Sequence, residues 1–185
     1  MYLVDTNIVS AGAPSKTASP RALVAWMDEN SADLHMSAVS IAEIEGGIAR
    51  LHRHGSRRRA DELSAWLDTV LHLYAERILP FEVQAARIAG GLADRARSKG
   101  QAPGFADVVI AATAKLRGFT ILTRNSRHFE PLDVPFLDPF VRLPPRARSR
   151  GEPALVPAIR RTARARQRDI ARPHPEEGGR PVFLP

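Results

Sequence analysis

The chain has no cysteine and no long hydrophobic run. Disulfide bonds, thiolate zinc sites and cysteine nucleophiles are therefore excluded. The most apolar internal stretch, residues 108–114, is far too short to cross a bilayer. A carboxylate at position 5 is also incompatible with a secretory signal peptide. We therefore expect a cytoplasmic protein that has no membrane partner.

Several familiar catalytic and binding motifs are also missing. The sequence contains no Walker loop, GxGxxG, HExxH or G-x-S-x-G pattern. Their absence argues against the usual nucleotide-binding, zinc-protease and serine-hydrolase classes.

Positive charge is concentrated near one end of the chain. The net charge is +7, yet residues 1–140 hold 16 Lys+Arg and 16 Asp+Glu. Residues 141–185 hold 11 arginines, four acids and eight of the 15 prolines, so the whole excess lies there. The high pI thus says little about the folded part. We expect a folded domain over 1–140 and an extended, disordered Arg/Pro-rich tail over 141–185.

Apolar runs alternate with amphipathic stretches along the first 140 residues. The run Met1–Val4 has no polar alternation, which is typical of a central strand covered on both faces. This alternation predicts an α/β fold with a parallel sheet flanked by helices. We expect strands at 1–4, 33–37, 78–81, 119–123 and 134–137, the last at an edge, and helices from 20 and over 40–51, 56–74, 82–98 and 105–117.

Three carboxylates are singled out by their positions. Asp5 follows the first strand, whereas Glu43 and Asp107 are each expected in the first turn of a helix. Helix starts lie beside strand ends in βα units, so all three should share the edge of the sheet where ligands usually bind. Gly46 and Gly47 follow Glu43 by one helical turn, which leaves this surface without bulky side chains.

Each acid also has a purely structural reading. Asp5, Thr6 or Asn7 could simply cap a following helix. The segment from Ser40 to Glu43 fits a capping box, in which the glutamate turns back onto the serine amide. Asp107 would be favoured in a first turn by the helix dipole alone.

If the three carboxylates do meet, their mutual repulsion requires a cation. Oxygen donors without cysteine favour Mg²⁺ or Mn²⁺. Such a cation stabilises charge on a phosphoryl oxygen and activates water for attack.

Two basic segments are weaker candidates. His52 and His54 lie two residues apart and so point away from each other on a helix, which is typical of solvated side chains. The run Arg57–Arg59 is typical of a solvated helix start, although it could also contact phosphate.

Four segments carry a resemblance to a known family: residues 3–7, 40–48, 106–114 and 122–125, which read LVDTN, SIAEIEGGI, ADVVIAATA and LTRN. In this order they resemble the PIN-domain family, and more closely the VapC-type toxins of toxin–antitoxin pairs, in the branch that includes FitB and StbB proteins. The resemblance covers residues 1–140 and not the tail.

The resemblance implies a Rossmann-like parallel sheet and a Mg²⁺- or Mn²⁺-dependent endoribonuclease toxin. It also implies a homodimer, an RNA substrate and a cognate antitoxin that inserts a segment into the acidic cleft. The family's metal-binding acids correspond to Asp5, Glu43 and Asp107.

One position departs from the family pattern. Many members have a fourth acid where this chain has Asn125, so the catalytic set is Asp5, Glu43, Asp107 and Asn125 with one charge fewer. With one charge fewer, a second metal ion would bind less tightly, so the use of one metal ion instead of two stays open as an alternative. Thr6 and Thr123 are expected to orient the carboxylates. The alternative function is a catalytically weak PIN-like module that acts through its antitoxin and nucleic acid.

Overall fold

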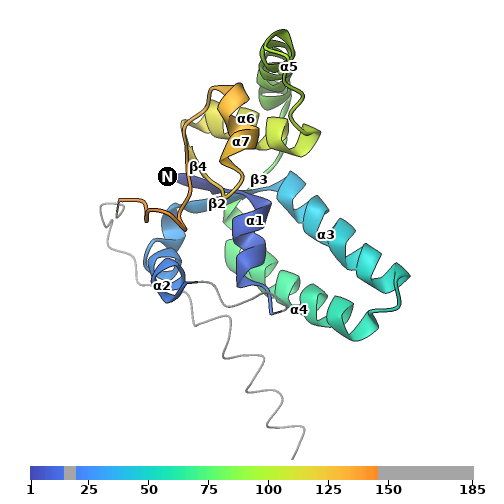
Figure 1. The fold of residues 1–185 in the computed structure, drawn as a ribbon. Helices are drawn as coiled ribbons and strands as arrows, with labels where there is room; N and C mark the ends of the chain where they lie inside the picture. The colour runs from blue at the N-terminus through green and yellow to red at the C-terminus, as the bar shows by residue number, and fades with distance from the viewer. Residues whose placement is uncertain (15–19, 146–185) are drawn as a thin grey trace, which may run out of the picture.

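Strand β1 (Tyr2–Val4) lies in the middle of a five-stranded sheet with the order β3-β2-β1-β4-β5 (Figure 1). The computed structural model describes residues 1–14 and 20–145. All the strand pairs are parallel, as the alternation of strands and helices predicts. The other strands are β2 (Leu34–Ser37), β3 (Ile78–Leu79), β4 (Thr120–Leu122) and β5 (Phe136–Leu137). The predicted α/β class, the central place of the first strand and the edge place of the last are thus confirmed.

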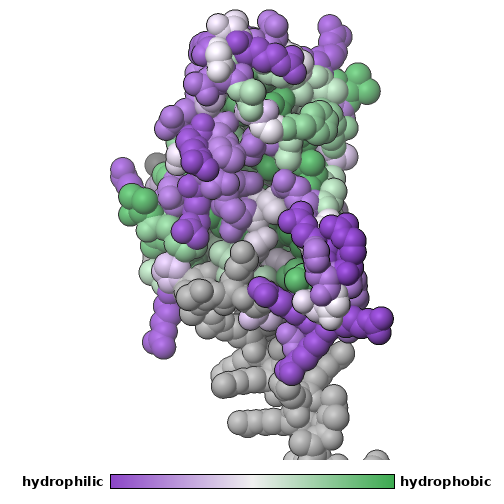
Figure 2. Space-filling model, turned by 45° about the vertical axis from the view of Figure 1, so that its right-hand side comes forward, coloured by the Kyte–Doolittle hydropathy of each residue, from purple (hydrophilic) through white to green (hydrophobic). Residues whose placement is uncertain are grey.

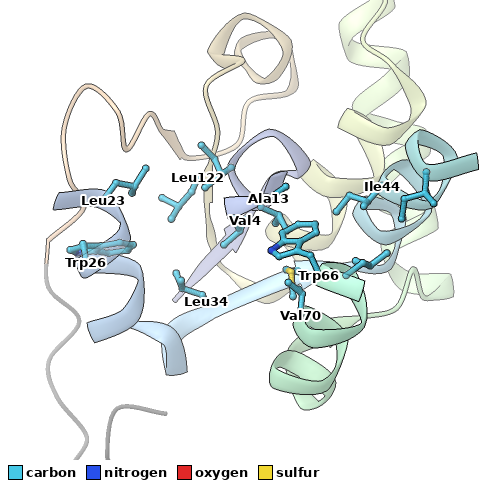
Figure 3. Close-up of a cluster of buried hydrophobic side chains, with 14 of the residues drawn as sticks. Val4, Ala13, Leu23, Trp26, Leu34, Ile44, Trp66, Val70 and Leu122 are labelled. Atoms are coloured by element: carbon cyan, nitrogen blue, oxygen red, sulfur yellow. The ribbon is translucent and has the colours of Figure 1, made fainter. Parts of the chain in front are cut away.

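Helices cover both faces of this sheet (Figure 1). Successive side chains of a strand point to opposite faces, and Val4 and Leu3 accordingly join two different cores. On the Val4 face, α2, α3 and α4 supply Trp26, Ile44 and Trp66 (Figure 3). On the Leu3 face, α5 and α6 supply small and aliphatic side chains. The helices are α1 (Thr6–Val9), α2 (Arg21–Glu29), α3 (Ala38–Arg53), α4 (Arg57–Tyr74), α5 (Val83–Ser98), α6 (Phe105–Arg117) and α7 (Ser126–Phe129), and single 3-10 turns lie at Ser10–Gly12, Ser31–Asp33, Ala75–Arg77 and Glu130–Leu132.

The start of α3 differs from the prediction. The N-cap is Ser37, whose hydroxyl accepts a hydrogen bond from the Val39 amide at 3.3 Å. Ser40 lies inside the helix and is buried, so the alternative interpretation of Ser40 and Glu43 as a capping box is wrong. Strand β2 passes directly into the helix at Ser37, which leaves no loop between the two elements.

The described residues continue past the predicted boundary at 140. Pro144 is buried, and the Tyr2 hydroxyl donates to the Pro145 carbonyl at 3.2 Å. Residues 146–185 lie outside the described residues, so the disordered tail stays a prediction. Within the described ranges, no helix is long and apolar enough to cross a membrane.

Candidate active site at the carboxyl edge of the sheet

Two neighbouring strands end side by side and place the centre of the site. Val4 of β1 pairs with Leu122 of β4 in parallel register. The next residue of each strand, Asp5 and Thr123, therefore lies at the same edge, and the Asp5 amide donates to the Leu122 carbonyl at 3.0 Å. The regular ladder of the sheet thus fixes the backbone that carries the first carboxylate.

Asp5 is buried, with 4% of its surface exposed. Its Oδ1 accepts from the Thr6 amide at 2.7 Å, so Asp5 also caps α1, as the structural reading of this residue anticipates. Its Oδ2 accepts from the Thr123 hydroxyl at 2.7 Å and from the Asn7 side-chain amide. Asp5 is therefore both a helix cap and a carboxylate held in one orientation by fixed donors.

Burial raises the pKa of Asp5 above its ordinary value. The hydrogen bonds from Thr123 and Thr6 lower this pKa, whereas the charges of Asp107 and Glu43 raise it. Desolvation and like charge both disfavour the ionised form. A cation at this edge would favour the ionised form, so the electrostatics of Asp5 suit a site for positive charge.

Glu43 approaches the edge from α3. It is the sixth residue of that helix, so the prediction that it lies in the first turn is wrong, because the helix begins at Ala38. Its side chain is exposed, and its Oε2 accepts from the Thr6 hydroxyl at 2.5 Å. Since Thr6 also donates its amide to Asp5, this residue links two of the three carboxylates.

Asp107 lies in the first turn of α6, as predicted. Its Oδ2 is 3.2 Å from Nδ1 of His128, which lies in α7, the short helix that follows β4. A β-carbon added at Gly104 would lie 3.0 Å from the same oxygen. Glycine at this N-cap position therefore leaves room for the carboxylate in its present rotamer.

Two residues make contacts in the site that were not predicted from the sequence. Asn7 donates to Asp5 and to the Thr123 hydroxyl, the latter at 3.2 Å, and accepts from the Arg124 amide at 3.2 Å. His128 contacts Asp107 from a position 21 residues further along the chain. Asn7 belongs to the LVDTN segment and so had a local signal, whereas nothing near His128 in the sequence indicates its partner.

The polar residues expected around the carboxylates occupy defined positions. The hydroxyls of Thr6 and Thr123 donate to Glu43 and Asp5, and their expected role beside a metal ion stays a prediction. Asn125 joins the network through its backbone amide, which donates to the Thr123 hydroxyl at 2.9 Å. Its proposed part in metal binding stays a prediction.

The donor atoms at this edge suit a hydrated hard cation. Among the described residues, no three Asp, Glu or His side chains lie close enough to one another to enclose a metal ion directly. The available donors are carboxylate, hydroxyl and amide oxygens, which Mg²⁺ prefers. Mg²⁺ usually keeps several waters and binds one or two carboxylates. Asp5, Glu43 and Asp107 influence one another electrostatically without touching, which suits an ion that keeps part of its water shell.

Comparison with known proteins places the chain in a family. Residues 2–134 match the PIN domain. The chain is 33% identical to VapC ribonuclease Y4jK of Sinorhizobium fredii, over 76% of this chain and 98% of that protein. It is 34% identical to Toxin FitB of Neisseria gonorrhoeae, over 76% and 99% of the two chains. The crystal structure of FitAcB from Neisseria gonorrhoeae superposes with a TM-score of 0.65, covering 76% of this chain and 99% of that one. The chain thus belongs to the PIN domain family, in the branch that contains the VapC and FitB proteins.

Proposed function

We propose that this protein is a divalent-metal-dependent endoribonuclease and the toxin of a toxin–antitoxin pair. The observation that carries the proposal is the placement of Asp5, Glu43 and Asp107 at one edge of the sheet, close enough for the last two to raise the pKa of the first. The names of two relatives, VapC ribonuclease Y4jK and Toxin FitB, support the same activity and role.

Asp5, Asp107 and Glu43 would hold Mg²⁺ or Mn²⁺, with the Asn125 side-chain amide as a neutral fourth donor. The ion would offset charge on the scissile phosphate and lower the pKa of an attacking water. Thr123, Asn7 and the Thr6 amide keep the Asp5 carboxylate in one orientation, so little reorganisation is needed when RNA binds. Nδ1 of His128 lies 3.2 Å from Oδ2 of Asp107 and would restrict the orientation of that carboxylate.

We further propose an RNA substrate, a homodimer and a cognate antitoxin in the cytoplasm. The solved FitAcB structure and the naming of FitB as a toxin support a protein partner of this kind. Carboxylates at an open edge attract a basic side chain, so an antitoxin arginine could occupy the site in place of the metal.

One observation favours the alternative, a catalytically weak module. The resemblance to the family implies a fourth acid where this chain has Asn125, and the described carboxylates do not enclose a metal ion by themselves. Such a protein would bind its antitoxin and nucleic acid without cleaving RNA.

A nuclease assay separates the two functions. Purified wild type should cleave single-stranded RNA in Mg²⁺ and lose the activity in EDTA. Asp107→Asn keeps the shape and removes the charge, and it should reduce the rate by at least about 10–100-fold, the usual effect of disturbing even the residues that support a metal ligand. Asp94→Asn, an exposed acid of α5, is the matched control and should cleave normally. Wild-type rates for Asp107→Asn would remove the nuclease assignment from these residues.

A further inference from the structure

The turn between α3 and α4, with the helix ends beside it, is strongly basic. Residues 50–59 contain five arginines and two histidines but no acid, and every one of these charged side chains is exposed. The described residues as a whole hold 16 Lys+Arg and 16 Asp+Glu, so the remainder has 11 cations against 16 acids. Figure 2 turns the right-hand side of Figure 1 toward the viewer and shows long hydrophilic side chains projecting where α3 meets α4. We call Arg50, Arg53, Arg57, Arg58 and Arg59 the arginine tip.

Most of the arginine tip has no acidic partner in the described part of the chain. Arg58 pairs with Glu62 at 3.0 Å, and His52 lies 3.8 Å from Asp61. Arg57, Arg58 and Arg59 line an open hollow of about 530 Å³ beside the turn. Like charges gathered without partners repel one another and do not stabilise the fold. Their concentration is better explained by an external anion.

One face of α3 connects the arginine tip to the acidic edge. Arg50 is seven residues beyond Glu43 and therefore lies on the same side of the helix, about 10 Å away along its axis. Between them lie Gly46 and Gly47, where an added β-carbon would meet nothing within 4 Å. A strand of polyanion could lie along this bare surface, with one phosphate at the carboxylates and others at the arginines.

We propose that the arginine tip binds the phosphate backbone of the RNA whose cleavage takes place at Asp5, Glu43 and Asp107. This inference rests on the proposed ribonuclease function. The acidic edge repels a polyanion, so binding energy must come from elsewhere on the surface. Arginine suits this role because its guanidinium contacts phosphate oxygens with two donors at once. Arg50 and Arg53 follow Gly46 by four and seven residues, so they lie on its side of α3 and would make the contacts closest to the reacting phosphate.

The test measures RNA binding without cleavage. A labelled single-stranded RNA is titrated in EDTA with Asp107→Asn protein that carries either Arg50→Gln and Arg53→Gln or no further change. Fluorescence anisotropy at several salt concentrations gives the slope of log K against log salt. Each phosphate contact to a single strand contributes about −0.7 to that slope. Loss of two contacts should make it about 1.4 less steep and weaken binding on the order of 10-fold near 0.1 M salt.

The chain offers a matched control at the end of α5. Arg95 and Arg97 are exposed and lie in the last turn of their helix, as Arg50 and Arg53 do in α3. Arg95→Gln with Arg97→Gln removes the same charge from the same helical position. This control should keep the wild-type slope. An equal loss in both double variants would mean a general charge effect and would overturn the proposal, as would an unchanged slope in the α3 variant.

A second readout separates this inference from the ribonuclease assignment. In the otherwise wild-type protein with Mg²⁺, the α3 double variant should raise KM for a long RNA and leave kcat unchanged, because it removes uniform binding. If wild type does not cleave RNA but RNA binding still depends on the arginine tip, the proposed ribonuclease function is wrong and the RNA-binding role of the tip is supported. If tip variants bind RNA normally but lose a duplex DNA or a co-purified protein, the tip serves that partner and the RNA proposal is overturned.

Discussion

Thr123→Val tests how firmly the fold holds its buried carboxylate. The Thr123 side chain is fully buried, and valine has nearly the same shape without the hydroxyl. That hydroxyl donates to Asp5 Oδ2 at 2.7 Å and accepts from the Asn125 amide at 2.9 Å and from Asn7 at 3.2 Å. The substitution thus removes a donor to a charged acceptor and leaves a backbone amide without its acceptor.

The expected loss follows from these contacts. A hydrogen bond to a charged group contributes about 1.5–3 kcal/mol, and a buried group left unpaired costs about 1–3 kcal/mol. Asp5 keeps the Thr6 and Asn7 donors, which limits the loss, so we expect about 2 kcal/mol in urea unfolding at pH 7. For a chain of this size that corresponds to a fall in Tm of about 4–8 °C.

The same variant should show a defined pH dependence. The Thr123 hydroxyl lowers the pKa of Asp5, so its removal raises that pKa further above the unfolded value. The contribution of this hydrogen bond is therefore present when Asp5 is ionised and is lost as pH falls through the folded pKa. The deficit of Thr123→Val relative to wild type should therefore shrink as pH falls through the folded pKa of Asp5, which lies above the ordinary pKa of aspartate, about 3.9.

Thr113→Val provides the control for Thr123→Val. Thr113 is also buried, but its hydroxyl donates to the Val109 carbonyl at 2.8 Å within α6. That carbonyl already accepts a helical hydrogen bond, so this loss should cost less than about 1 kcal/mol. If the two variants unfold at the same urea concentration at pH 7, the hydroxyl of Thr123 does not support Asp5 in the way described.

Three further predictions concern the metal and the helices. Asn125→Asp should tighten Mg²⁺ binding in calorimetric titration by adding a fourth charge, and an unchanged Kd would exclude this side chain from the site. Gly46→Ala should raise the free energy of unfolding in urea by about 1 kcal/mol, since alanine is the better helix former and its β-carbon meets no atom within 4 Å; Gly90→Ala in α5 should match it. Mg²⁺ should raise Tm less at pH 5 than at pH 7, because protons compete for Asp5, whose pKa burial raises; equal shifts would contradict Asp5 as a ligand.

Local patterns were sufficient for most of the architecture. The apolar run before Asp5 predicted a central strand, because only a strand covered on both faces has no polar alternation. The bounds of α6 were predicted to the residue, since Gly104 precedes it and Gly118 ends it with a φ of 67° that favours glycine. Asp5 and Asp107 could be placed at the carboxyl edge from the same signals.

Other features depend on tertiary structure and had no local signal. Both Ser37 and Ser40 are good N-cap residues, and the Glu43 spacing favoured the wrong one. Only the end of β2 at Ser37, fixed by its pairing with β1 and β3, decides where α3 begins. The contact between His128 and Asp107 likewise requires α6 and α7 to be packed together, which spacing in the sequence does not encode.

The order in which the ribosome makes the chain has a consequence for when the site can exist. Asp5 is synthesised well before its partner Thr123, which lies 118 residues later. β1 pairs with β4 as well as with β2, so the middle of the sheet stays open on one side until β4 emerges. Parallel pairing over such a separation is intrinsically slow. A nascent chain therefore carries Asp5 without an assembled site until β4 has emerged, and any nuclease activity must wait for that step.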